Sequence, residues 1–219
     1  KVFTSLSAFY AFMVDEDLME ANPVVPFRRR YLEQYKDNGS EPRQLISIDQ
    51  AAMLINSVLH SRDKAFLTLL FKTGMRLGEL CSLDVGDLAL QDMSLVVKPT
   101  AKRSNRQLFF DHETARMLHA WLASRQDVNS ASPLFISTWK RRISSKEIED
   151  LTKKHAARVG LHNPNSERLA DRFTPHCCRH WLVTHLLRAG MSRDHVKWIR
   201  GDAMKESIDI YYHIDAEDV

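Results

Sequence analysis

The stretch TPHCCRHWLVTHLLRAGMSRDHVKWIRGDAMKESIDIYYHI, residues 174–214, holds five histidines, four arginines, two cysteines and two adjacent tyrosines. These ionisable groups stand among apolar residues with helical spacing. A metal site, a nucleic-acid surface and a phosphoryl-transfer site would each account for such a stretch. The other segments of the chain help to choose among these three.

The start of this stretch favours an anion site over a metal site. His176, Arg179 and His180 share one face near a helix N-terminus, which favours anions. A metal site would use both histidines and one cysteine, but adjacent cysteines on a helix point in different directions, and the chain has no Cys-x-x-Cys pair. We therefore expect Cys177 and Cys178 to be small core residues.

The composition limits the class of protein. The 219 residues suffice for one large domain, or one domain plus part of another, and the net charge of +3 permits nucleic-acid binding without requiring it. Three cysteines make no disulfide framework, so a reducing compartment is expected. The opening KVFTSLSAFYAFMV lacks a signal-peptide cleavage site, and no stretch is long and apolar enough to span a membrane. Because residue 1 is Lys, we expect the chain to begin inside a longer protein.

The apolar pattern predicts a mainly helical chain with one small sheet. A helix over 3–20 should be stopped by Pro23 and Pro26, and 21–44 is interpreted as a linker. Ser47 and Gln50 predict a capping box, and Gly74 should end a central, very apolar helix. The segment SLVVKPTAKRSNRQLFF, residues 94–110, predicts an antiparallel hairpin. Further helices are expected at 75–83, at 112–125, at 145–159 with a capping box from Ser144 and Glu147, at 175–189 after an N-cap at Thr174, at 193–200 and at 205–212. The fold class is mainly α with a small antiparallel β-sheet.

Three segments together resemble a known family. They are TGMRLGELCSLDVGDL (73–88), HCCRHWLVTHLLRAG (176–190) and IRGDAMKESIDIYYHI (199–214). In order and spacing they resemble the signature segments of the tyrosine recombinase (phage integrase) family, with microbial integrases and Xer-type recombinases as the nearest relatives. The resemblance implies that residues 45–219 are the catalytic domain. Residues 1–22 would then be the C-terminal helix of a truncated core-binding (SAM-like) domain, and 23–44 a linker.

The resemblance also implies catalytic roles. Arg76 and Arg179 match the two family arginines that clamp the scissile phosphate, and His176 matches a proton-transfer group. Tyr211 stands where the family has its nucleophile, while Tyr212 falls one position later. The implied reaction is cleavage and rejoining of DNA through a 3′-phosphotyrosyl link, with no metal, ATP or other cofactor.

Other matches are less direct. The family places a lysine on the hairpin; Lys102 fits the spacing better than Lys98. Where the family usually has His after a glycine, this chain has Asp202, which could instead hold Arg179 or another group in place. The supporting residues implied by the resemblance are Glu79, His180 and His213, and the DNA-binding candidates are Lys98, Arg103, Arg106, Lys140, Arg141 and Arg142.

The expected partner is double-stranded DNA at recombination sites, where the family assembles a homotetramer. This chain alone is expected to be a monomer or weak oligomer, to bind DNA weakly and in a salt-sensitive way, and to act in the cytoplasm near the nucleoid. Two alternatives stay open: a DNA-binding module with impaired catalysis, for which Asp202 is the only support, and a nicking-closing activity like that of type IB topoisomerases.

Overall fold

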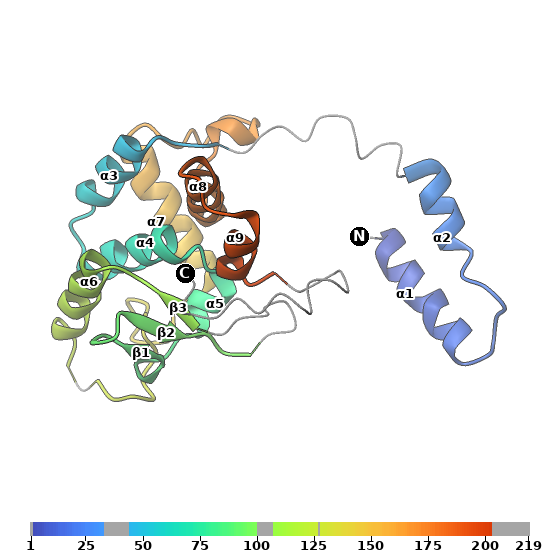
Figure 1. Ribbon diagram of the computed structural model, residues 1–219, viewed down its shortest axis with the longest axis horizontal. Helices are drawn as coiled ribbons and strands as arrows, with labels where there is room; N and C mark the ends of the chain where they lie inside the picture. Colours follow the sequence, from blue (N-terminus) through green and yellow to red (C-terminus); the bar gives the residue numbers. More distant parts are fainter. Residues whose placement is uncertain (1, 33–43, 100–106, 127, 203–219) are drawn as a thin grey trace. The chain divides into compact units, whose positions relative to one another are not determined.

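The computed structural model describes residues 2–32, 44–99, 107–126 and 128–202 (Figure 1). Contacts between residues divide the chain into two compact units, Lys1–Pro42 and Arg43–Val219. The two units are treated separately below. The second unit holds the described part of the candidate site.

The first unit is a short helical piece. Helix α1 spans Val2–Asp15, α2 spans Val24–Phe27 and a π-helical turn covers Arg28–Leu32. Asn22 fixes the connection, because its Nδ2 donates to the Ser7 carbonyl at 2.8 Å and its Oδ1 accepts from the Val24 N–H at 3.0 Å. The rings of Phe3 and Phe27 stack with centroids 5.6 Å apart. Both contacts hold α1 against the α2 segment.

The structure corrects two expectations for this unit. The helix predicted over 3–20 ends at Asp15, and Asp17 has a left-handed φ of 56°. The segment interpreted as a linker is helical from Val24 to Leu32. Pro23 precedes α2 and Pro26 lies in its first turn, where backbone N–H groups have no partner inside the helix, so neither proline stops it. The assignment to a core-binding domain stays a prediction.

The first two helices of the second unit have the predicted ends. Helix α3 spans Ile48–Ser57, and its capping box is confirmed: Gln50 N donates to Ser47 Oγ at 3.1 Å, and Ser47 N donates to Gln50 Oε1 at 2.9 Å. Helix α4 spans Ser61–Thr73 and ends at Gly74, whose φ of 57° is left-handed. A Cβ at Gly74 would lie 2.8 Å from Leu182 Cδ2, so this position requires glycine for both conformation and space.

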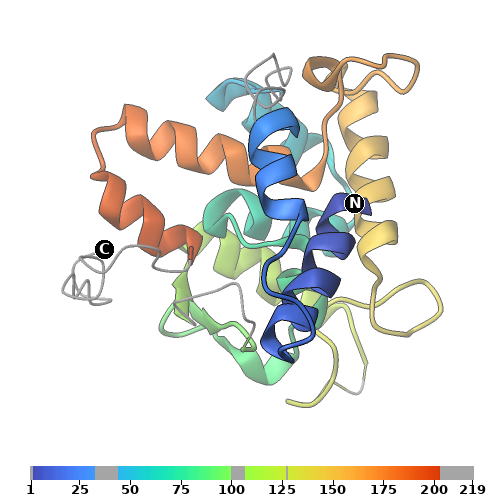
Figure 2. The same ribbon diagram turned by 90° about the vertical axis from the view of Figure 1, so that its right-hand side faces the viewer.

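Helix α4 is the centre of the second unit, as its apolar sequence predicts. It packs against α6, which spans His112–Ala123, and against α8, which spans Pro175–Arg188 (Figures 1 and 2). The fully buried side chains include Phe66, Leu67, Leu69, Leu70 and Phe71 of α4. Because α4 is covered on most sides, its end at Gly74 is a rigid support for the residues that follow.

The predicted hairpin is confirmed and has an additional strand. Strand β2 (Ser94–Val96) pairs antiparallel with β3 (Gln107–Phe109), with Leu95 opposite Leu108. The additional strand β1 is only two residues long, Leu88–Ala89, and pairs with the other edge of β2. Such a short strand has too few residues to show an alternating pattern in the sequence.

The other helices follow the predicted order. They are α5 (Leu77–Ser82), α7 (Ser145–Arg158), α8 and α9 (Arg193–Arg200), with single 3₁₀ turns at Val85–Asp87 and Leu169–Asp171. At the start of α7, Glu147 N donates to Ser144 Oγ at 3.1 Å. The Glu147 carboxylate pairs with Arg62 of α4 at 3.4 Å, a partner that the capping-box prediction did not include. The helix predicted at 205–212 lies outside the described residues.

A polar cluster of Arg62, Asp63 and His155 is buried between α4 and α7. Asp63 Oδ1 accepts from Arg62 Nε at 2.8 Å, and Asp63 Oδ2 lies 2.8 Å from His155 Nε2. Arg62 also donates to the Ile136 carbonyl at 2.8 Å. The side chains of Arg62, Asp63 and His155 are each 6% exposed, so the hydrogen bonds of Asp63 stand in place of contacts with water.

Two further expectations from the sequence concern the cysteines and the membrane. Cys177 and Cys178 lie in the core, as predicted, and burial raises the pKa of the Cys178 thiol well above its ordinary value. Among the helices that the structure describes, none is both long enough and apolar enough to cross a bilayer.

Candidate active site

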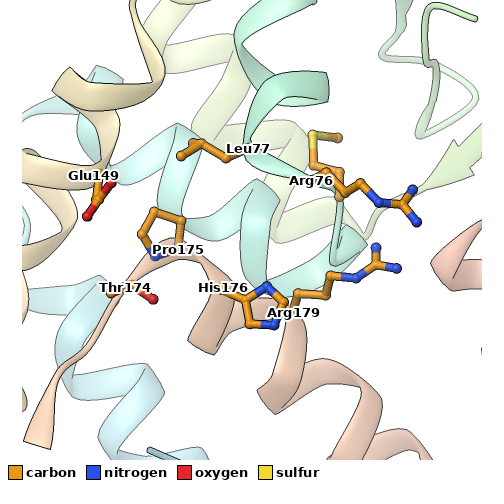
Figure 3. A pocket seen from close by; sticks show the side chains of 8 residues that line it. Arg76, Leu77, Glu149, Thr174, Pro175, His176 and Arg179 are labelled. Atoms are coloured by element: carbon orange, nitrogen blue, oxygen red, sulfur yellow. The ribbon is translucent and has the colours of Figure 1, made fainter. Parts of the chain in front are cut away.

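A pocket of about 430 Å³ opens where α5 and α8 begin (Figure 3). Its lining includes Arg76, Glu149 of α7, and Thr174, Pro175, His176 and Arg179. The guanidinium groups of Arg76 and Arg179 lie close together at one side of it (Figure 3). The pocket therefore joins residues that are about a hundred positions apart in the chain.

Arg76 is held on one side by an acidic neighbour. It stands directly before α5, and its Nη1 donates to Glu79 Oε1 at 3.1 Å. Glu79 Oε2 also accepts from the Arg76 backbone N–H at 2.7 Å, and the Glu79 side chain is only 3% exposed. The Arg76 side chain itself is 30% exposed. Glu79 thus holds Arg76 in place and leaves the end of its guanidinium accessible.

Arg179 is fixed mainly by backbone carbonyls. Its Nη1 donates to the Gly74 carbonyl at 2.7 Å, and its Nη2 donates to the Arg200 carbonyl at 2.8 Å. The side chain is 8% exposed. Gly74 follows α4 and Arg200 ends α9, so this arginine joins three helices.

Asp202 lies between the two arginines. Its Oδ1 is 3.3 Å from Arg76 Nη2 and 3.4 Å from Arg179 Nη2. Its Oδ2 forms an ion pair with Arg200 Nε at 3.1 Å. Asp202 follows Gly201, which ends α9 with a left-handed φ of 61°. The prediction that Asp202 holds Arg179 or another group in place has this geometry as its support.

The two histidines of the predicted site differ in exposure. His176 is exposed and lines the pocket from the first turn of α8, beside the Arg179 side chain (Figure 3). His180 is half-buried one turn further along α8. The start of α8 at Thr174 also lines the pocket, and the positive end of the helix dipole adds positive potential there. An anion with several oxygens fits this combination of guanidinium groups, imidazole and helix N-terminus.

Two predicted DNA-binding residues have an acidic partner. Lys98 Nζ and Arg142 Nη2 both bind the Asp84 carboxylate, and Arg142 also donates to the carbonyls of Cys81 and Leu83. Burial raises the pKa of Asp84, but the hydrogen bonds from Lys98 and Arg142 outweigh it and hold that pKa below its ordinary value. Both cations therefore help to join the sheet region to the loop before α7.

Lys140 and Arg141 are placed differently. Both are exposed in a tight turn, where Lys140 N donates to the Ser137 carbonyl at 3.0 Å and Ser137 N donates to the Arg141 carbonyl at 2.7 Å. Trp139, in the same turn, is 83% exposed. An exposed turn with two cations and an indole is suited to contact with a nucleic acid.

The remaining predicted site residues lie outside the described residues. They are Lys102, Arg103, Arg106, Tyr211 and His213. Tyr212, the alternative nucleophile, lies outside them too.

The sequence analysis missed two residues that shape the site. Gly74 was interpreted only as a helix end, but its carbonyl also accepts from Arg179. Arg200 was not singled out, yet it supplies both a carbonyl for Arg179 and an ion pair for Asp202. The signal that could have identified Arg200 is its position two residues before Asp202, beside a glycine that ends a helix.

The chain matches a known protein family over most of its length. The model of the phage integrase family matches residues 40–218. Among curated proteins, the tyrosine recombinase XerC of Thermodesulfovibrio yellowstonii is 26% identical over 224 residues, which cover 97% of this chain and 69% of the relative. The XerC of Pelotomaculum thermopropionicum is 29% identical over 225 residues, covering 96% of this chain and 68% of the relative.

Solved structures share the fold. The XerA recombinase is 25% identical with a TM-score of 0.65, covering 99% of this chain and 72% of that one. The Tn1549 transposon integrase, solved in complex with transposon right end DNA, is 18% identical with a TM-score of 0.73, covering 99% and 75%. Similarity thus extends over nearly all of this chain, in sequence and in fold.

Proposed function

Because the chain belongs to the phage integrase family and is a tyrosine site-specific recombinase, we propose that it cleaves and rejoins duplex DNA through a covalent 3′-phosphotyrosyl intermediate. The observation that best supports this mechanism is the convergence of Arg76 and Arg179 on one side of the pocket. The proposed substrate is a DNA phosphodiester at a recombination site.

The two arginines would bind the non-bridging oxygens of the scissile phosphate. A guanidinium group offers charge and parallel N–H donors, which suit a phosphorus centre with five oxygens around it. Glu79 and the Gly74 carbonyl hold the two side chains before substrate arrives. Such preorganised charge stabilises the transition state without any rearrangement during the reaction.

In the cleavage step the Tyr211 oxygen attacks phosphorus, and the bond from phosphorus to the 5′-oxygen breaks. His176 would accept the tyrosine proton, and Lys102 would protonate the leaving 5′-oxygen. Rejoining is the reverse, with a 5′-hydroxyl as the attacking group. Because the phosphotyrosyl bond conserves the energy of the phosphodiester, the proposed cycle consumes no ATP, and the arginines provide the charge that a metal ion would otherwise supply.

The choice of Lys102 over Lys98 has support from the geometry. Lys98 binds Asp84, a carboxylate that Arg142 also contacts. A lysine in such a pair would have to leave Asp84 before it could donate a proton to substrate. We therefore keep Lys102 as the proposed proton donor.

The mechanism is tested by trapping the covalent intermediate. The substrates are nicked duplexes with randomised central positions. Cleavage near the nick releases a short piece of one strand, so that rejoining is prevented. We expect a protein–DNA adduct that survives denaturant, with the DNA on a peptide containing Tyr211 as identified by mass spectrometry. Tyr212→Phe should still form the adduct and Tyr211→Phe should not. An adduct with Tyr211→Phe that maps to Tyr212 would reassign the nucleophile.

Two alternative functions give different results in the same experiment. A DNA-binding module would bind the duplexes but form no adduct with any of them. A nicking-closing enzyme would form the adduct and also relax supercoiled plasmid without a second site. A recombinase needs two partner sites, which we propose are brought together by a homotetramer of the protein.

Lys140 and Arg141 are expected to contact DNA phosphates. Replacing each with alanine should weaken binding about equally for all sequences, and should lower the slope of log affinity against log salt by about 0.9 per residue. Fluorescence anisotropy with a labelled duplex at several salt concentrations measures this slope. Arg142→Ala is the matched control, because Arg142 binds Asp84 and two carbonyls. It should lower thermal stability and change the slope less. Equal slopes for all three variants would contradict a specific role of the turn.

A further inference from the structure

We propose that Asp202 is an internal counter-anion, whose carboxylate occupies the position between Arg76 and Arg179 that a DNA phosphate takes in the proposed function. The inference rests on that function for the identity of the substrate. It assigns Asp202 as a positioning residue with a second effect: it excludes free small anions from the two arginines. A phosphate held by a bound duplex would displace it.

The hydrogen bonds of the arginines identify this position. Nη1 of Arg76 donates a hydrogen bond to the Glu79 carboxylate, and Nη1 of Arg179 donates one to the Gly74 carbonyl. The Nη2 atoms of both arginines contact one atom, Asp202 Oδ1, at 3.3 and 3.4 Å. An oxygen that bridges two guanidinium groups in this way has the position expected for a non-bridging phosphate oxygen.

The two carboxylates around Arg76 differ in how firmly they are held. Glu79 is 3% exposed, and its two contacts with Arg76 are 2.7 and 3.1 Å long. Asp202 is 30% exposed, and its contacts with the two arginines, at 3.3 and 3.4 Å, are longer than either contact of Glu79 with Arg76. Glu79 therefore acts as a permanent support, whereas Asp202 can be displaced.

Arg200 gives the displaced carboxylate an alternative partner. It already pairs with Asp202 Oδ2 at 3.1 Å, and its own side chain is 42% exposed. Rotation of the Asp202 side chain toward Arg200 would withdraw Oδ1 from both Nη2 atoms while keeping the carboxylate paired. Arg179 Nη2 would keep its hydrogen bond to the Arg200 carbonyl. Three guanidinium groups from three segments therefore face Asp202: Arg76 before α5, Arg179 of α8 and Arg200 of α9.

The chemical consequence is selectivity among phosphates. Without Asp202, two adjacent guanidinium groups near a helix N-terminus would bind inorganic phosphate or sulfate readily. With Asp202 in place, a small anion has to compete with a carboxylate that is part of the protein. A DNA phosphodiester has additional contacts along the duplex, which offset that competition.

The test is a titration with inorganic phosphate by isothermal calorimetry, at fixed ionic strength. We expect Asp202→Asn and Asp202→Ser to bind phosphate at least about tenfold more tightly than the unaltered chain, a factor equal to 1.4 kcal/mol. Asp202→Glu retains the charge and should bind as weakly as the unaltered chain. Asp194→Asn on α9 is the matched control, because it makes the same change in net charge in a residue that pairs only weakly with Lys197 at 3.7 Å. It should leave phosphate affinity unchanged.

The outcomes separate this inference from the proposed function. If Asp202→Asn and Asp202→Ser both bind phosphate no more tightly than the unaltered chain, the counter-anion proposal is wrong, whether or not an adduct forms with DNA. The same result in Asp194→Asn as in Asp202→Asn would also overturn it, since only net charge would then matter. Tighter phosphate binding by the neutral variants, with no adduct from any protein in the trapping experiment, would support the counter-anion and contradict the strand-cleavage mechanism.

Discussion

Replacing Arg179 with lysine is expected to slow formation of the covalent protein–DNA adduct about thousandfold, the upper range for loss of one preorganised donor to developing negative charge. The expectation follows from the two ends of its guanidinium. One end is anchored on the Gly74 carbonyl and the other reaches the site between the arginines. A lysine has one nitrogen and cannot do both.

The flat fork of the guanidinium is the reason that lysine does not suffice. Lysine keeps the positive charge and most of the length, so simple attraction to DNA should be nearly unchanged. What is lost is the second donor in a fixed direction. The variant is therefore expected to bind the nicked duplex within about threefold of the unaltered chain, while the cleavage step itself becomes slow.

Single-turnover adduct formation at saturating protein measures this step separately from binding. Arg188→Lys is the matched control, because Arg188 is exposed at the end of the same helix. It should form the adduct at the normal rate. If Arg179→Lys slows adduct formation less than tenfold, the proposed binding of the scissile phosphate by Arg76 and Arg179 is wrong. Thermal melting of both variants shows whether a slow rate reflects loss of folded protein.

Helix ends were predictable because they depend on residues close together in the sequence. The Ser47–Gln50 box and the glycine after α4 form hydrogen bonds within a few positions. Such local chemistry can be recognised from residue types and spacing alone. The same reasoning failed at Pro23 and Pro26, where the chain turns into a new helix. Proline is compatible with the first turn of a helix, and a sequence pattern does not distinguish a stop from a new start.

The candidate site was predictable only through the resemblance. Taken singly, Arg76 is an arginine at a helix start, and most arginines are exposed. Nothing in its spacing shows that it lies near Arg179, because their proximity depends on how α4 and α8 pack. The roles of Gly74 and Arg200 were missed for the same reason: both bind Arg179 through backbone carbonyls, and every residue has one.

Replacing Asp63 with asparagine is expected to lower the free energy of unfolding of the second unit by about 3–5 kcal/mol, the range for breaking a buried charged pair. Asp63 accepts from Arg62 and lies 2.8 Å from His155, and the three side chains are almost fully covered. Asparagine has one oxygen for these partners and no charge to balance the buried guanidinium. Arg62 would then be left with the Ile136 carbonyl and a distant contact to Glu147.

The same carboxylate predicts how stability depends on pH. Burial by itself raises the pKa of Asp63, but the hydrogen bonds from His155 and Arg62 outweigh it and hold that pKa below its ordinary value. A lowered pKa in the folded state means that the unfolded chain binds a proton first as pH falls. The contribution of Asp63 is therefore complete above the unfolded pKa of about 3.9 and is lost as pH falls below it, through the folded pKa.

Urea unfolding followed by tryptophan fluorescence measures both effects. All four tryptophans lie in the second unit, so the signal reports that unit. Asp150→Asn is the matched control: Asp150 pairs with Lys146 at 2.7 Å on the surface of α7, and its loss should cost less than about 1 kcal/mol. As the pH falls below about 4, the unaltered chain and Asp150→Asn should lose stability more steeply than Asp63→Asn, which lacks the buried carboxylate. Equal losses in the two variants at neutral pH would show that the buried cluster contributes no more than a surface pair.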